Sequence, residues 1–301
     1  MGVLAVKSMR ALAGAAAFLC AGIAQGEERA TISGPAAMLN ARYAAFKEER
    51  VKSQFHRPLH IESSEGPGGV AGEIHALVES PFAATTAALK EPSHWCEILL
   101  LHLDTKDCSL LTEGNRTALR VGVVSKYDQP ASSAYRVSFG YRLGEETASF
   151  MQVILDAAAG PLGTTNYRIV LEAMPAEEGR TFIRMSYSYS YGVMARIGMQ
   201  AYLATFGRSK VGFTMVATEP DGQPRYIGGM RGVVERNTMR YYLAVEAYLG
   251  ALPLPQEARL EKSLRDWYSA IERYPRQLHE MAEGEYIAMK RREFAGQQAK
   301  S

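Results

Sequence analysis

The stretch that decides the fold is Met185–Gly192, which reads MSYSYSYG. Tyrosine and serine alternate in it with period two, which is typical of a β-strand with one buried face. Three large aromatic rings therefore point one way and three serines point the other way. Similar alternation, with apolar residues on one face, begins upstream at Leu119, Tyr135, Met151 and Tyr167. The pattern predicts five consecutive strands.

The connections between these strands are short and rich in turn residues, at 128–130, 143–145, 160–163 and 178–179. Consecutive strands with short connections predict an antiparallel meander. One face of this meander is apolar, so another layer must cover it. Two further strands are expected at Pro58–Ser63 and Val70–Glu79, which makes about seven strands in all.

Helices are expected both before and after the meander in the sequence. The stretch VESPFAATTAAL, residues 78–89, ends a strand and starts a helix at Ser80-Pro81, where a hydroxyl cap precedes a proline. A second short helix is expected at Ser93–Leu100. After the meander, Met230–Leu249 carries an apolar stripe of helical period, formed by Met230, Val234, Tyr241, Val245 and Tyr248. This helix can cover the sheet.

In this order of elements, about residues 57–250 resemble the START-like superfamily, which has the helix-grip fold. The stretches VESPFAATTAAL and MSYSYSYG and the helix Met230–Leu249 carry the resemblance. It implies an α+β fold in which a curved antiparallel sheet of about seven strands grips a long C-terminal helix, with flanking helices. It also implies an apolar ligand between sheet and helix. The chain further resembles a group of exported bacterial proteins of this type.

The N-terminus has the layout of a secretory signal peptide, predicted for residues 1–26. Lys7 and Arg10 precede an apolar run, Ala11–Ala24, and small residues follow at Ala24 and Gly26. The run is shorter than the ~20 residues of a membrane span. We therefore expect an exported, periplasmic bacterial protein. An uncleaved anchor or a buried helix is the alternative.

An exported protein can keep its cysteines paired, because disulfides persist in oxidising compartments. Without residues 1–26 the chain keeps Cys96 and Cys108, which predicts one disulfide. A metal or redox pair is the alternative, but neither a CxxC spacing nor a histidine cluster supports it.

The domains expected are 27–56, a linker with a helix; 57–252, the START-like domain; and 253–301, a C-terminal helical extension.

Composition excludes several classes of protein. The chain has 301 residues, of which 47% are hydrophobic and 22% charged, so it is neither disordered nor fibrous. Its mean hydropathy of -0.16 argues against a polytopic membrane protein. Lys7 and Arg10 account for the net charge of +2, so the remainder is neutral and no nucleic-acid partner is expected. No P-loop, nucleophile elbow or HExxH motif occurs, so we assign no catalytic residue, metal ligand or cofactor.

The candidate ligand-binding residues lie on the apolar face of the meander and on the long helix. They are Tyr141, Tyr167, Tyr187, Tyr189, Tyr191, Arg231, Glu235, Thr238 and Tyr241. Tyrosine rings can line a pocket and bond a polar headgroup, although ordinary packing gives the same pattern. Arg231 and Glu235, four residues apart, can form the polar end of such a pocket or a solvated ion pair.

Three functions remain open. The leading hypothesis is binding, with transfer as an extension, of a hydrophobic or amphipathic molecule such as a lipid. The second is a cyclase or isomerase, with Glu235 and Arg231 or a tyrosine as the acid–base pair. The third is a structural protein that binds a protein partner through the amphipathic helix Leu260–Tyr274. The apolar stretch Val193–Phe206 is either core or a lid that makes transient membrane contact.

Overall fold

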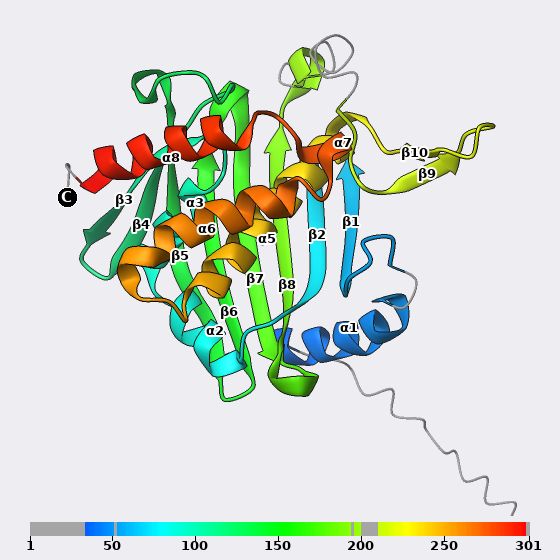
Figure 1. Cartoon of the computed structure of the whole chain (residues 1–301), viewed down its shortest axis with the longest axis horizontal. Helices are drawn as coiled ribbons and strands as arrows, with labels where there is room; N and C mark the ends of the chain where they lie inside the picture. The colour runs from blue at the N-terminus through cyan, green and yellow to red at the C-terminus, as the bar shows by residue number, and fades with distance from the viewer. Residues whose placement is uncertain (1–33, 51–52, 194–195, 200–209, 299–301) are drawn as a thin grey trace, which may run out of the picture. The chain divides into compact units, whose positions relative to one another are not determined.

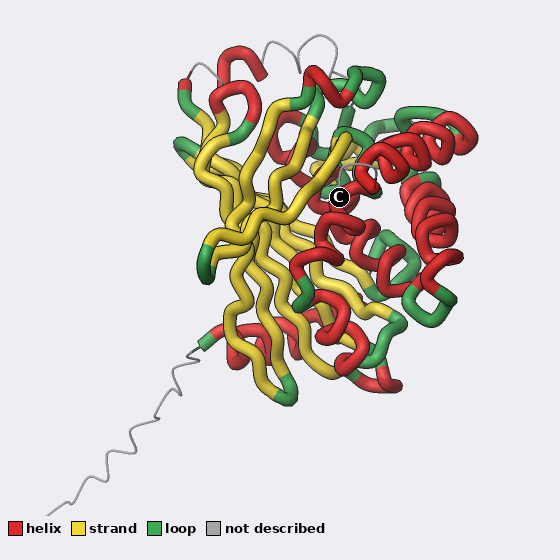
Figure 2. The backbone as a smooth tube through the Cα atoms, turned by 90° about the vertical axis from the view of Figure 1, so that its left-hand side faces the viewer, coloured by secondary structure: helices red, strands yellow, loops and turns green. Residues whose placement is uncertain are grey.

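The computed structural model describes residues 34–50, 53–193, 196–199 and 210–298. Its main element is an eight-stranded antiparallel sheet, curved as Figures 1 and 2 show. The strands are β1 (Leu59–Gly66), β2 (Gly69–Val78), β3 (Thr105–Glu113), β4 (Arg116–Val123), β5 (Tyr135–Thr147), β6 (Phe150–Ala159), β7 (Thr164–Pro175) and β8 (Thr181–Tyr191). Their order is β1-β2-β8-β7-β6-β5-β4-β3, so the first hairpin lies beside the last strand.

Helices cover one face of this sheet (Figure 2). They are α2 (Phe82–Leu89), α3 (Pro92–Leu100), α5 (Gly229–Ala251), α6 (Gln256–Ile271), α7 (Pro275–Leu278) and α8 (Glu283–Gln298). The long helix α5 packs on β1, β2 and β8, while α6 packs on α5 and α8 packs on β3. The predicted α+β fold, a curved antiparallel sheet around a long helix, is confirmed.

The strand count differs from the prediction of about seven because of β3. This edge strand reads TKDCSLLTE, and most of its outer half is exposed, so it lacks the apolar alternation of the inner strands. An edge strand needs only one buried face and one partner, so its sequence signal is weaker. Apart from the main sheet, β9 (Met215–Thr218) pairs with β10 (Pro224–Tyr226) in a two-stranded sheet.

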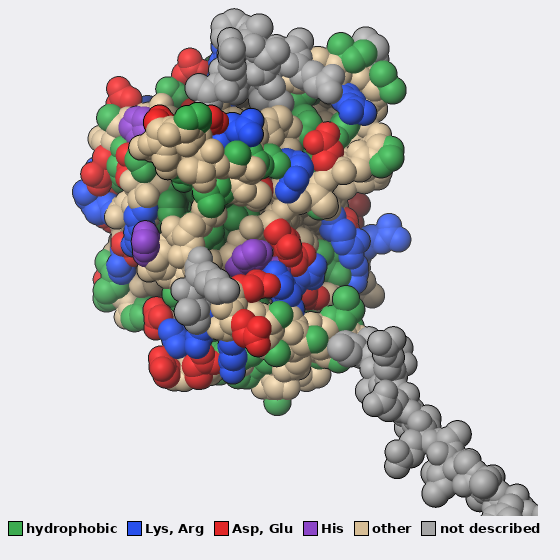
Figure 3. Space-filling model, turned by 90° about the vertical axis from the view of Figure 1, so that its right-hand side faces the viewer, with side chains coloured by type: hydrophobic (Ala, Val, Ile, Leu, Met, Phe, Trp, Pro, Cys, Tyr) green, Lys and Arg blue, Asp and Glu red, His purple; other side chains and the backbone are tan. Residues whose placement is uncertain are grey.

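The sheet has a core on each face. The larger core joins the inward side chains of all eight strands to α3, α5, α6 and α8. The smaller core lies on the opposite face, where α1 (Pro35–Glu49) packs Leu39, Tyr43 and Phe46 against the sheet. Beside β1, acidic, basic and histidine side chains gather on the surface (Figure 3).

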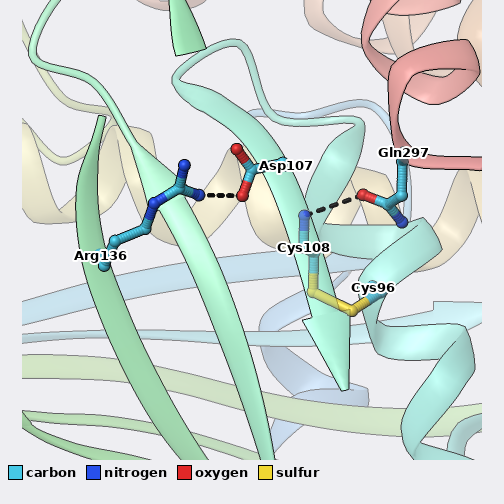
Figure 4. Close-up of a disulfide and its surroundings, with 5 residues drawn as sticks. All are labelled: Cys96, Asp107, Cys108, Arg136 and Gln297. Atoms are coloured by element: carbon cyan, nitrogen blue, oxygen red, sulfur yellow. Dashed lines mark hydrogen bonds and ion pairs between the residues drawn. A yellow bond between two sulfur atoms is a disulfide. The ribbon is translucent and has the colours of Figure 1, made fainter. Parts of the chain in front are cut away.

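The predicted disulfide between Cys96 and Cys108 is present and joins α3 to β3 (Figure 4). The backbone N–H of Cys108 donates to Gln297 of α8 at 2.8 Å. On the other side of β3, Asp107 is paired with Arg136. The edge of the sheet is therefore fastened to a helix before it and to a helix at the end of the chain.

The C-terminal helices belong to the same compact unit as the sheet, which runs from Gly34 to Ser301. Trp267, Tyr286 and Lys290 are fully buried. The Tyr286 hydroxyl donates to the Leu101 carbonyl at 2.9 Å, and Lys290 Nζ donates to the carbonyls of residues 102 and 105 at 2.6 and 2.8 Å. The domain boundaries at residues 57 and 252 stay predictions.

Two predicted segments lie wholly or partly outside the described residues. The predicted signal peptide, residues 1–26, lies entirely outside them. Of Val193–Phe206 only residues 193 and 196–199 are described; Val193 and Ile197 are exposed there, whereas Met199 packs against the large core. Within the described residues, no helix has both the length and the apolar character needed to cross a membrane.

Candidate functional site

Five tyrosines meet between the sheet and α5, and we call them the tyrosine cluster: Tyr167, Tyr187, Tyr189, Tyr191 and Tyr241. The three tyrosines of β8 are buried, as the alternation in MSYSYSYG predicts. Tyr167 reaches over from β7 and stacks on Tyr189, with ring centroids 5.2 Å apart. Tyr241 of α5 packs against Tyr187 at 5.4 Å. The sheet and the helix thus contribute rings to one aromatic group.

Tyr167 and Tyr241 are half-buried, whereas the three tyrosines of β8 are buried. Burial raises the pKa of the Tyr187, Tyr189 and Tyr241 hydroxyls, so all three stay protonated at neutral pH. No described residue accepts a hydrogen bond from Tyr189 or Tyr241, whereas the Tyr191 hydroxyl donates to Glu65 at 2.9 Å. The cluster therefore offers protonated hydroxyl groups that can donate hydrogen bonds beside buried aromatic rings.

A histidine that the sequence analysis did not assign lies against this cluster. His102, in the connection from α3 to β3, stacks on Tyr241 with ring centroids 4.9 Å apart, and only 3% of it is exposed. Its Nδ1 accepts the backbone N–H of Asp104 at 3.2 Å, which leaves the ring proton on Nε2. That Nε2 is buried and has no hydrogen-bond partner among the described residues.

The charge state of His102 follows from its surroundings. Burial, followed by the nearby cations Arg240, Lys290 and Arg236, holds the pKa of His102 well below its usual value. The ring is neutral at pH 7 and can donate one hydrogen bond through Nε2. A lone histidine without a motif gives no signal in the sequence; only the meeting of the α3–β3 connection with α5 makes it notable.

Tyr141 lies on the same face of the sheet but outside the cluster. Its hydroxyl donates to the carbonyl of Lys90 at 2.6 Å and so fastens β5 to the end of α2.

Arg231 and Glu235 lie near β1, and they are joined through Ser63 rather than bonded to each other. The Ser63 hydroxyl donates to Glu235 at 2.5 Å, and Arg231 Nε lies 3.0 Å from the same hydroxyl. Glu235 is fully buried and also accepts the backbone N–H groups of Phe213 and Thr214 and the Thr214 hydroxyl, at 2.6 to 2.9 Å. Its oxygens are thus occupied by protein donors that fasten the segment before β9 to α5.

Thr238 is also fully buried, one turn further along α5. Its hydroxyl donates to the carbonyl of Val234 at 2.7 Å and lies close above Gly72 of β2. Of the nine predicted site residues, the structure brings five together in the cluster. Tyr141, Arg231, Glu235 and Thr238 lie elsewhere and bond to the protein's own groups.

Two open clefts lie elsewhere on the molecule. One, of about 380 Å³, lies between β2 and the helices α5 and α6, and it includes Arg57, Ser80 and Arg273. The other, of about 810 Å³, lies between the loop at 127–131 and α8. No member of the tyrosine cluster lines either cleft.

Comparison with known proteins gives similarity in structure alone. No protein-family model and no curated protein matches the sequence. Norcoclaurine synthase from Thalictrum flavum is 16% identical with a TM-score of 0.33, over 50% of this chain and 86% of that chain. Ara h 8.0201 is 12% identical with a TM-score of 0.35, over 64% and 99% of the two chains.

Human StAR-related lipid transfer protein 5 is 11% identical with a TM-score of 0.32, over 57% of this chain and 89% of that chain. Similarity at this level carries no conclusion about a ligand or a reaction. Membership of the START-like superfamily therefore stays a prediction, and what the molecule can do must be argued from its own side chains.

Proposed function

We propose that the protein binds a small hydrophobic or amphipathic molecule, such as a lipid, at the tyrosine cluster between the sheet and α5. The observation that carries this proposal is the set of donors without protein partners there. Nε2 of His102 is buried and has no acceptor among the described residues. The nearby hydroxyls of Tyr189 and Tyr241 form no hydrogen bond with a described residue either, and Tyr241 stacks on His102. A molecule with an apolar body and one or two acceptor atoms fits this combination.

The energetics favour such a ligand. Removing apolar surface from water stabilises a complex by about 25 cal/mol per Å² before ordering costs. Nε2 of His102 is a buried donor without an acceptor, which costs roughly 1–3 kcal/mol, and an acceptor on the ligand recovers part of that cost. The rings of Tyr167 and Tyr241 are the half-buried members of the cluster, so in this proposal the ligand enters beside them.

We place this binding in the periplasm, because residues 1–26 have the features of a secretory signal peptide. Native mass spectrometry of the untagged protein from a periplasmic fraction tests both parts. The expected species starts at Glu27 and carries one apolar molecule. A cytoplasmic chain of full length contradicts the location. A periplasmic chain that neither carries nor takes up a molecule from a membrane extract contradicts binding.

A pair of hydroxyl deletions tests the site itself, with the fluorescent fatty acid cis-parinaric acid as the probe. The double variant Tyr189→Phe/Tyr241→Phe keeps both rings and removes both donors. At about 1 kcal/mol for each hydrogen bond, binding weakens by about 10- to 30-fold. Tyr43→Phe is the control, since the Tyr43 hydroxyl likewise has no partner among the described residues but belongs to α1 on the opposite face of the sheet. Equal affinity in the double variant and the control contradicts the assignment.

A further inference from the structure

Four side chains with metal-ligating groups form a square on the face of the β1–β2 hairpin that lies under α1. His60 is the direct cross-strand partner of His75, and Glu62 is the partner of Glu73. Because residues two apart in a strand share a face, all four side chains project to the same side. The sequence places them as His-x-Glu on β1 and Glu-x-His on β2.

The distances in this square are close to those of a metal centre. One ligand atom from each of Glu62, Glu73 and His75 lies within 4.8 Å of the others. The rings of His60 and His75 are 6.1 Å apart between centroids, and His60 Nε2 lies 4.0 Å from Glu62. Ligand atoms around a tetrahedral zinc lie about 3.4 Å apart, so metal binding requires these side chains to move closer together, His60 most of all.

A cation already lies among these groups, namely the guanidinium of Arg42 from α1. Its Nε is 3.0 Å from Nε2 of His75 and its Nη2 is 3.2 Å from Nδ1, while Nη2 also reaches Glu62 at 3.4 Å. Nη1 donates to Glu49 at 2.9 Å. The square therefore attracts positive charge, and the guanidinium that supplies it is also bonded to Glu49, which can keep it when a metal ion takes its place.

Neighbouring groups hold two of the four side chains in place. Arg184 pairs with one carboxylate oxygen of Glu73, and the other oxygen faces His75 at 2.8 Å. Arg184 in turn bonds Glu172 at 2.8 Å. The His75 ring is fully buried and stacks on Phe182. Outer contacts of this kind orient ligands in metal sites and are part of what makes binding tight.

We propose that His60, Glu62, Glu73 and His75 bind one divalent transition-metal ion, such as Zn²⁺, in competition with the guanidinium of Arg42. Two imidazoles and two carboxylates suit zinc and its first-row neighbours better than calcium or magnesium, which prefer oxygen alone. Four protein ligands leave no open position, so the ion is structural. It joins β1 to β2 on the face opposite the tyrosine cluster, independently of the proposed ligand site.

Calorimetric titration of the untagged, EDTA-treated protein with ZnCl₂ tests the proposal. One ion binds the wild type, and His60→Ala or Glu62→Gln weakens binding at least 100-fold. Both residues lie outside the core, so these variants fold, which thermal unfolding confirms. Arg42→Met tightens zinc binding at least tenfold, because it removes a positive charge about 3 Å from the ligands.

The control is His279→Ala, which removes a histidine paired with Glu272 at 2.9 Å on the C-terminal segment. Zinc affinity unchanged by this control supports a site at the hairpin. Two results overturn the proposal. One is zinc binding that His60→Ala and Glu62→Gln leave unchanged. The other is no binding in both wild type and Arg42→Met, which leaves these side chains as an ion-pair network that holds α1 to the sheet.

Discussion

At the scale of single residues, the contact between α5 and the sheet depends on a glycine. Gly72 of β2 lies directly under Thr238, and a Cβ at this position would lie 2.4 Å from the Thr238 hydroxyl oxygen and 3.3 Å from the Val234 carbonyl. The helix therefore approaches the strand more closely than any other residue type allows. This close approach sets the distance between α5 and the neighbouring strand β8, where Tyr241 packs against Tyr187.

We expect Gly72→Ala to lower the free energy of unfolding by about 1–3 kcal/mol, the usual cost of forcing extra volume into a packed interior. Adding Thr238→Ala restores part of the loss, because it removes the atom nearest to the new methyl group. Gly140→Ala is the control, since its Cβ would meet only the Asp156 carbonyl at 3.7 Å. Urea unfolding measures all three; no rescue by Thr238→Ala would contradict this account.

At the scale of elements, α5 has polar groups on the side that faces away from the sheet, and the C-terminal segment covers them. Arg236 and Arg240 are each 5% exposed and share the carboxylate of Glu280 at 2.5 and 2.8 Å. Lys210 reaches the same carboxylate at 3.0 Å. Burial raises the pKa of Glu280, but Arg240, Arg236 and Lys210 outweigh burial and hold this pKa below its usual value. One carboxylate thus anchors the connection between α7 and α8.

Glu280→Gln should cost about 2–4 kcal/mol at pH 7, because it removes the negative charge between two buried guanidinium groups. The pKa of Glu280 is lower in the folded than in the unfolded state, so its stabilisation is complete above pH 4.5 and is lost as the pH falls below that value. The difference between wild type and variant therefore shrinks in acid.

Urea unfolding at pH 7, 5 and 4 measures this difference. Glu261→Gln is the control, because Glu261 also bonds two arginines, Arg265 and Arg291, but at the surface. It should cost about 0–1 kcal/mol. Equal losses in the free energy of unfolding for the two variants would contradict a larger stabilisation by the buried Glu280 carboxylate.

At the scale of the whole molecule, the described residues form three layers, namely the sheet, α5 on its inner face and α6 over α5, and α8 packs between α6 and β3. Trp267 of α6 donates to the carbonyl of Arg240 at 3.1 Å, and its ring stacks on Tyr286 of α8. The last helix then returns to β3 and the disulfide. The outermost layer is thus part of the core rather than an appendage.

A chain that ends at Leu252 should therefore lose its native structure. Removal of residues 253–301 uncovers the outer side of α5 and takes away the acceptor that Arg236 and Arg240 share. We expect no cooperative thermal transition, loss of the near-ultraviolet circular dichroism signal and binding of a hydrophobic dye. A cooperative transition with a native near-ultraviolet spectrum would contradict this expectation and would mark residue 252 as a true domain boundary.

The sequence by itself determined the local features. Period-two alternation identifies the inner strands and the inward tyrosines of MSYSYSYG, and a helical stripe identifies α5 from Met230 to Leu249. It also determined the pair Cys96 and Cys108, since only two cysteines follow residue 26. These features are readable because burial on one face of an element depends on the spacing of neighbouring residues.

The tertiary structure decided everything that joins distant parts of the chain. Alternation does not reveal the edge strand β3, nor that Glu235 bonds Ser63 and Thr214 instead of facing a ligand. It does not place His102 on Tyr241, or Glu62 beside Arg42 of α1. Such partners are 20 to about 170 residues apart. Their meeting follows from how the elements pack together, which a local pattern does not encode.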